Sequence, residues 1–344
     1  MAVHPTVPED VPSLVEAYRQ TLASFADVAD GFREQDWSLP TACPGWNTRA
    51  HLAHVHHLED YLSGSEHPIS GWADEVAGSG EQSANDSHAR GGAADDSHVE
   101  IGSPAHVQNR FGVWIEEGVR ARSGRDPRAL TADLRGLIDV RAAQMYDPDL
   151  ALDTPVRGAV GRETTFENLT RMRMADVWVH EQDLREAVNR PGSLDSPGAS
   201  IFTDLLLGSL ADIVITHVRP EPGTVVILES TGPVLGRAGV RVGTDADGEL
   251  IGHELFSGHT EEEALEDASD VEATSDVDAT SDADAADTDT PDSASEHQVT
   301  NISLSTYALT RRGAGRVSTQ DTAYHVVGDE DLARRVLDAL AVTP

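Results

Sequence analysis

The chain has 344 residues, of which 39% are hydrophobic, and a formal net charge of −35 at pH 7. This length allows one large domain or two modest domains with sizeable cores. The negative charge argues against nucleic-acid binding and against anionic membranes, because both would repel the protein. The sequence has no run of about 18 apolar residues that would predict a membrane span. Its start lacks the basic and apolar regions of a signal peptide, so we expect a cytoplasmic protein.

The first half of the chain has apolar residues at three- and four-residue steps, which predicts amphipathic helices. Asn47 is a good N-cap, so we expect one of these helices to run from Thr48 to about Leu62. Asn189-Arg190-Pro191-Gly192 is a sharp stop signal for another helix. The remaining helices are predicted over residues 11–32, from about 107, and over 127–145, 166–188 and 199–218.

After Pro220 the pattern changes to short apolar runs separated by Gly-rich turns, which predicts strands. These strands are expected over residues 225–228, 240–242, 302–309 and 324–327, with a closing helix over 330–340. The predicted fold class is therefore α + (α+β). An all-helical N-terminal domain would span residues 1–218, and a small α+β C-terminal domain would span 219–344.

Two segments have compositions that do not favour a packed core. Residues 64–104 are rich in Gly, Ser, Ala, Asp and His, which predicts a mobile insertion in the helical domain. Glu261 to Glu296 contains 15 acidic residues and no basic residue. We therefore expect a disordered acidic insertion over about 259–297 in the C-terminal domain.

The predicted second helix carries four histidines within seven residues, which are His51, His54, His56 and His57. His54 can share a helix face with His51 or His57, whereas His56 points elsewhere. On its own the cluster is also explained by a solvated polar face. It becomes a candidate metal site only if another element supplies further ligands.

A second candidate group lies on the helix predicted over residues 166–188. Asp176 and His180 are four residues apart, so both project from one helix face, and Asp183 follows along the same stripe. The neighbouring residues, such as Met174 and Trp178, make this helix largely apolar. A charged stripe on a mostly buried helix needs a partner, and a cation would supply one.

His54, Asp176 and His180 together form a candidate divalent-metal site. Zinc binds histidine nitrogen and carboxylate oxygen readily, and three protein ligands with one open position are typical of catalytic zinc. Iron or another divalent ion also suits these ligands, so the sequence favours zinc without excluding other metals.

The motifs resemble those of the mycothiol-dependent maleylpyruvate isomerase family, whose members are DinB-like four-helix bundles. Three segments carry the resemblance, in this order. They are Cys43-Pro44-Gly45-Trp46 followed by His54, the series Arg173, Asp176, His180 and Asp183, and a tail with Gly315-Arg316, Val327-Gly328-Asp329 and Ala341-Val342-Thr343-Pro344. The resemblance covers nearly the whole chain except the two insertions.

The resemblance implies an N-terminal DinB-like four-helix bundle with a zinc site made by His54, Asp176 and His180. It also implies a low-molecular-weight thiol such as mycothiol as cosubstrate, and an isomerase or S-transferase reaction on a small electrophilic substrate. Asp176 stands where the family usually has glutamate. Because aspartate is one methylene shorter, the metal would sit closer to the helix or bind more weakly.

Within this interpretation, Arg316 is the candidate for holding a substrate carboxylate, since arginine binds carboxylates bidentately. A turn arginine after Gly315 is the alternative. Cys43 lies in a Pro-Gly turn with no evident base, so we expect a structural role for it. As the only cysteine, it can form no internal disulfide.

Two other functions remain open from the sequence. A metal at the same site could activate water, giving a hydrolase with Asp183 or His57 as base. The bundle could instead be a non-catalytic metal-binding or regulatory protein. A requirement for added thiol would separate the first alternative from the thiol-dependent enzyme.

Overall fold

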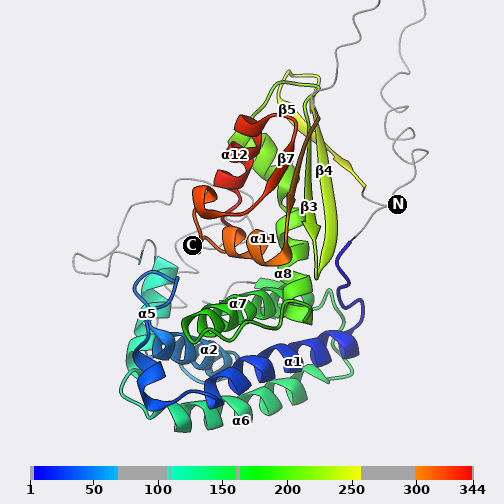
Figure 1. Cartoon of the computed structure of the whole chain (residues 1–344). Helices are drawn as coiled ribbons and strands as arrows, with labels where there is room; N and C mark the ends of the chain where they lie inside the picture. Colours follow the sequence, from blue (N-terminus) through cyan, green and yellow to red (C-terminus); the bar gives the residue numbers. More distant parts are fainter. Residues whose placement is uncertain (1–3, 69–106, 108–109, 160–162, 257–298, 343–344) are drawn as a thin grey trace, which may run out of the picture.

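The computed structural model describes residues 4–68, 107, 110–159, 163–256 and 299–342 (Figure 1). Apart from residues 64–68, the two predicted insertions lie outside these ranges. The N-terminal half is helical, as predicted. Its main helices are α1 (Val11–Asp30), α2 (Thr48–Leu62), α5 (Arg110–Arg122), α6 (Pro127–Met145), α7 (Phe166–Ala187) and α8 (Pro197–Gly208).

Side-chain caps start the two helices that carry the predicted ligands. The Asn47 side chain accepts a hydrogen bond from the Ala50 N–H at the start of α2. The Thr165 side chain does the same for the Asn168 N–H at the start of α7. These bonds satisfy amide groups that have no partner within the helix, and therefore fix where each helix begins.

The helices α1, α2, α6 and α7 lie beside one another at the base of the molecule (Figure 1). α7 contacts α1 and α2, and α6 contacts the same two helices. α5 packs on α2, and α8 packs on α7. The description as a four-helix bundle and the domain boundary at residue 218 stay predictions, since one apolar core runs from these helices into the sheet.

The C-terminal half contains a five-stranded sheet with the strand order β5-β4-β3-β6-β7. β3 pairs antiparallel with β4 and parallel with β6. The helices α8, α11 and α12 contact the sheet. The elements are β3 (Val225–Thr231), β4 (Leu235–Thr244), β5 (Leu250–Leu255), β6 (Val299–Leu304), α11 (Thr306–Gly313), β7 (His325–Val327) and α12 (Glu330–Ala339).

Three of the predicted elements are wrong in part. The strand predicted over 302–309 ends at Leu304, and α11 begins at Thr306, because the Ser305 side chain caps it by accepting from the Ala308 N–H. The segment between the helices predicted over 127–145 and 166–188, in a half of the chain predicted to be all helical, contains a short strand, β1 (Pro155–Arg157), which pairs with β2 (Glu163–Thr165). The helix predicted over 199–218 consists of α8, the short α9 (Leu210–Asp212) and a π-helical turn η3 (Ile213–Val218).

The segment Pro197–Val218 is long and apolar enough, by length and composition alone, to cross a membrane. A core helix meets the same criteria. Here 56% of its apolar 18-residue stretch is buried inside the protein, and α8 contacts α7, β3 and β4. These contacts explain its apolar composition by packing.

Candidate metal centre

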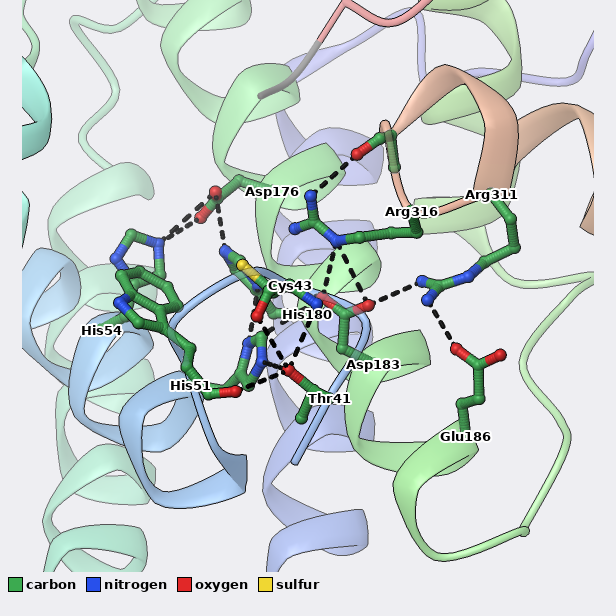
Figure 2. A network of polar contacts seen from close by, with 12 residues as sticks. Thr41, Cys43, His51, His54, Asp176, His180, Asp183, Glu186, Arg311 and Arg316 are labelled. Carbon is green, nitrogen blue, oxygen red and sulfur yellow. Dashed lines mark hydrogen bonds and ion pairs between the residues drawn. The ribbon is translucent and has the colours of Figure 1, made fainter. Parts of the chain in front are cut away.

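The three predicted ligands meet between α2 and α7 (Figure 2). His54 Nε2 lies 3.2 Å from Asp176 Oδ2, and His180 Nε2 lies 3.3 Å from Asp176 Oδ1. One ligand atom from each residue can be chosen so that all three lie within 4.8 Å of one another. The i, i+4 spacing places Asp176 and His180 on one face of α7, and α2 brings His54 opposite that face.

The spacing of these atoms suits a small divalent cation. Zinc bonds of about 2.0–2.2 Å give a tetrahedron with edges of about 3.3–3.6 Å. Asp176 Oδ1 lies 3.4 Å from His54 Nε2 and 3.3 Å from His180 Nε2, and both distances are close to such edges. Two imidazoles and one carboxylate also match the preferred donors of zinc. The residues present therefore fit a divalent cation in both chemistry and distance.

Exposure differs strongly among the three side chains. His54 and His180 are 5% and 7% exposed, whereas Asp176 is 35% exposed. The Trp46 ring lies against the two histidines, with its centroid 4.9 Å from that of His54 and 5.6 Å from that of His180. The cluster is thus closed by protein on the histidine side and reaches solvent on the Asp176 side.

The protonation states favour a cationic partner. Burial lowers the pKa of His54 to about 4 despite the nearby Asp176 charge, so this imidazole is neutral at pH 7. Burial alone would raise the pKa of Asp176, but His54, His180 and Arg173 hold it well below its usual range. Burial opposes protonation of His180, yet the Asp176 and Asp183 carboxylates raise the pKa of His180 above its ordinary value. The anionic Asp176 therefore attracts positive charge to this place.

A buried hydrogen-bond network holds the Asp176 carboxylate through Arg173. Arg173 donates to Asp176 Oδ2 and, through Nε and Nη2, to Glu59 Oε1 at 3.1 and 2.8 Å. Tyr18 on α1 donates its hydroxyl to the other Glu59 oxygen. Burial, together with the Glu59 charge, raises the pKa of Tyr18 well above its usual value, so the hydroxyl remains a donor. The network joins α1, α2 and α7 around the base of the site.

A second set of contacts orients His180. Its Nδ1 lies 2.9 Å from Nδ1 of His51 and 3.5 Å from Asp183 Oδ2. His51 is fully buried, and its Nε2 lies 2.8 Å from Thr41 Oγ1. Of these two contacts of His180 Nδ1, the one to His51 is the shorter. The sequence indicated that His51 can share a helix face with His54, but it did not indicate that His51 contacts His180.

Asp183 connects the helical half to the C-terminal half. Arg311 Nη1 donates to its Oδ1 at 2.7 Å, and Arg316 Nε donates to its Oδ2 at 3.1 Å (Figure 2). Arg311 also donates to Glu186 at 2.6 Å. With Asp176, Glu59 and Arg173 this network holds four carboxylates and three guanidinium groups. One negative charge thus remains for a cation when the histidines are neutral.

Arg316, the candidate substrate-binding residue, lies in this network with its side chain 2% exposed. Its Nε contacts Asp183 and its Nη1 donates to the Ala314 carbonyl at 2.8 Å. Nη2 makes no hydrogen bond with the described residues, so this nitrogen is left for a further acceptor. Sequence reasoning missed Arg311, which lies just beyond the strand predicted over 302–309 and belongs to α11 in the structure.

Cys43, His51 and Asp183 form a second group whose ligand atoms lie within 4.8 Å of one another. This group is a poor metal site, because two arginines already bind Asp183 and His51 uses both nitrogens. Burial raises the pKa of the Cys43 thiol to about 11, so it stays protonated at neutral pH. This agrees with the structural role expected for Cys43.

His56 and His57 lie outside the cluster. His56 Nδ1 accepts a hydrogen bond from Arg122 Nε at 3.0 Å. His57 is 1% exposed, and neither of its ring nitrogens has a partner among the described residues. Its ring packs against Trp114. Neither residue contacts the three candidate ligands through a hydrogen bond.

Comparison with known proteins agrees with the motifs. Two solved structures, of the mycothiol-dependent maleylpyruvate isomerase and of a histidine-to-alanine mutant of it, are 15% and 14% identical to this chain. Each alignment covers 94% of this chain and 95% of the other, with a TM-score of 0.46. No curated protein matches the chain significantly. Residues 18–185, which include all three candidate ligands, match the family model of the mycothiol maleylpyruvate isomerase N-terminal domain.

Proposed function

We propose that the protein is a divalent-metal-binding, thiol-dependent isomerase of the mycothiol type, acting on a small electrophilic substrate. The observation that carries this proposal is the cluster of His54, Asp176 and His180, which lies inside the matched family domain. Zinc is the metal that best suits two imidazoles and one carboxylate. The solvent-facing side at Asp176 leaves space for an additional ligand.

A bound divalent cation would act here as a Lewis acid that keeps a coordinating thiol deprotonated at neutral pH. The chain's own residues prepare this place. Neutral His54 presents a lone pair, Arg173 orients the Asp176 carboxylate, and the protein excludes water from the histidine side. Arg316 is our candidate for a substrate carboxylate, through its free Nη2 nitrogen.

The proposed reaction is a cis–trans isomerisation, for which maleylpyruvate is the substrate to test first. Addition of the thiol sulfur to an electron-poor double bond, with a proton to the neighbouring carbon, leaves a single bond. Rotation about this bond and loss of the same sulfur and a proton restore the double bond. The thiol is therefore not consumed. In an S-transferase the adduct would be the product, and one thiol would be used in each turnover.

Thiol stoichiometry separates the candidate functions. Purified protein is incubated with maleylpyruvate and mycothiol, and substrate, product and free thiol are followed together. Isomerisation that needs thiol but leaves its concentration constant supports the proposal. Thiol loss equal to product would indicate a transferase, and hydrolysis without thiol would indicate a hydrolase. Absence of turnover in protein that holds metal would favour a non-catalytic metal-binding role.

Metal content tests the site independently of turnover. We expect elemental analysis to find about one divalent ion per chain, and His54→Ala or His180→Ala to lose it. His56→Ala is the matched control, because it lies on the same helix and hydrogen-bonds Arg122 instead. Full metal content in His54→Ala would refute the assignment.

A further inference from the structure

His51 is a buried histidine that belongs neither to the candidate ligands nor to the motifs. It lies one turn before His54 on α2 and contacts His180 on α7 through the two Nδ1 atoms, 2.9 Å apart. In such a pair one nitrogen must carry the hydrogen and the other must accept it. Which nitrogen carries the hydrogen follows from the remaining bonds of His51.

Two backbone carbonyl groups near Thr41 determine which atoms donate and which accept in these hydrogen bonds. Thr41 Oγ1 lies 3.0 Å from the Trp46 carbonyl oxygen and 3.5 Å from that of Cys43. Carbonyl oxygens only accept, so the Thr41 hydroxyl donates its single hydrogen there. The Cys43 N–H also points to Thr41 Oγ1, at 3.3 Å. Thr41 therefore acts as an acceptor toward His51.

The hydrogen on His51 is assigned by the same reasoning. Nε2 of His51 lies 2.8 Å from Thr41 Oγ1 and must donate to it. In neutral His51 the Nδ1 atom is then unprotonated, and it accepts a hydrogen bond from Nδ1–H of His180. With its hydrogen on Nδ1, neutral His180 keeps the lone pair of Nε2, the nitrogen that lies 3.3 Å from Asp176. A metal-binding imidazole requires this tautomer.

We propose that His51 is a positioning residue that fixes His180 in the tautomer and orientation whose Nε2 faces the cluster. The inference deepens the proposed function and rests on its metal site. His180 is the ligand that receives this support, because Nδ1 of His54 has no partner among the described residues. Asp183, 3.5 Å from the same His180 nitrogen, adds electrostatic support to the N–H.

The first test reads the hydrogen positions directly, without metal or substrate. Histidine-labelled, metal-free protein is studied by ¹⁵N NMR, with resonances assigned through single substitutions. The expected spectrum shows His51 with its hydrogen on Nε2 and an unprotonated Nδ1, and His180 with a hydrogen on Nδ1. A hydrogen on Nδ1 of His51 would overturn the proposal. Failure of the thiol-dependent activity would not affect this result.

The second test measures zinc affinity by competition with a chelating dye. His51→Leu fills the space but accepts no hydrogen bond, and we expect a loss of about 10–100-fold in affinity. In His51→Asn the amide oxygen can replace Nδ1 as acceptor, so most of the affinity should return. His57→Leu is the matched control, because His57 is equally buried on the same helix and makes no hydrogen bond with the described residues.

The two tests separate the possible failures. Unchanged zinc affinity in His51→Leu, with the wild-type protein binding zinc, would refute the positioning role. If the wild-type protein bound no divalent metal, the metal site itself would be wrong, while the NMR spectrum would still decide the His51 tautomer. If His51→Leu did not fold, wild-type NMR and His51→Asn would decide the proposal.

Discussion

Arg173 on α7 and Glu59 on α2 form a buried ion pair in which Nε and Nη2 both donate to one carboxylate oxygen, at 3.1 and 2.8 Å. Glu59 is fully buried and Arg173 is nearly so. The same guanidinium group also contacts Asp176. The pair therefore couples the packing of two helices to the position of a candidate metal ligand.

Removing one partner of this pair should strongly destabilise the protein. We expect Arg173→Leu to lower the free energy of unfolding by about 3–5 kcal/mol, because Glu59 would be left as a buried, uncompensated charge. Arg120→Leu is the control, since Arg120 is 57% exposed and pairs with Glu117 on the surface. Its cost should be below about 1 kcal/mol. Equal costs in urea denaturation would contradict the buried role of Arg173.

The Asp176 carboxylate should control metal affinity. Removing a ligand charge in Asp176→Asn should weaken zinc binding more than the roughly 10–100-fold expected for a supporting residue. Asp176→Glu keeps the charge and supplies the longer side chain usual in the resembled family, so its affinity should stay close to wild type. Calorimetric titration with Zn²⁺ would measure both. Tight binding by Asp176→Asn would exclude this carboxylate as a ligand.

The buried His57 should make stability depend on pH. Burial lowers its pKa to about 2, whereas the unfolded chain has a pKa near 6.5. Below about pH 6.5 the unfolded chain takes up a proton that folded His57 does not, so stability falls as pH falls. Between about pH 7 and about pH 5, His57 should lower the free energy of unfolding by up to about 2 kcal/mol.

His57→Leu should therefore lose less stability than the wild type over the same pH range. Urea denaturation at several pH values measures this difference. His253→Gln, which replaces an exposed histidine on β5, is the control substitution. Parallel curves for His57→Leu and the wild-type protein would show that folded His57 takes up protons as readily as the unfolded chain.

Two helical glycines should respond in opposite ways to the same substitution. A Cβ at Gly118 on α5 would lie 2.1–2.4 Å from three His57 ring atoms, so Gly118→Ala should cost about 1–3 kcal/mol. A Cβ at Gly136 on α6 would meet nothing within 4 Å. Gly136→Ala should therefore raise stability by about 0.5–1 kcal/mol. Thermal denaturation of both variants would check the contrast.

Local signals in the sequence predicted the helical half well. Asn47 marked the start of α2, and both predicted ends of that helix are confirmed. The i, i+4 spacing of Asp176 and His180 indicated a shared face, and the structure places His54 opposite it. Ser305 was the missed signal, because its capping role separates β6 from α11 within an apolar run.

The supporting residues could not be predicted in the same way. Glu59 meets Arg173 across 114 positions, and no local pattern encodes such a contact. Thr41 acts through backbone carbonyl groups whose positions depend on the fold of the loop before α2. Patterns therefore identified candidate ligands, whereas the hydrogen bonds that orient them required the tertiary structure.

The two arginines that neutralise Asp183 come 128 and 133 positions after it. During synthesis, the helices of the first half would emerge well before either guanidinium group. Until then this carboxylate would have to stay hydrated or become buried without a positive partner, which is costly. We therefore expect a fragment that ends at residue 218 to be much less stable than the complete chain, and the second half to act as the intramolecular partner that completes folding of the first.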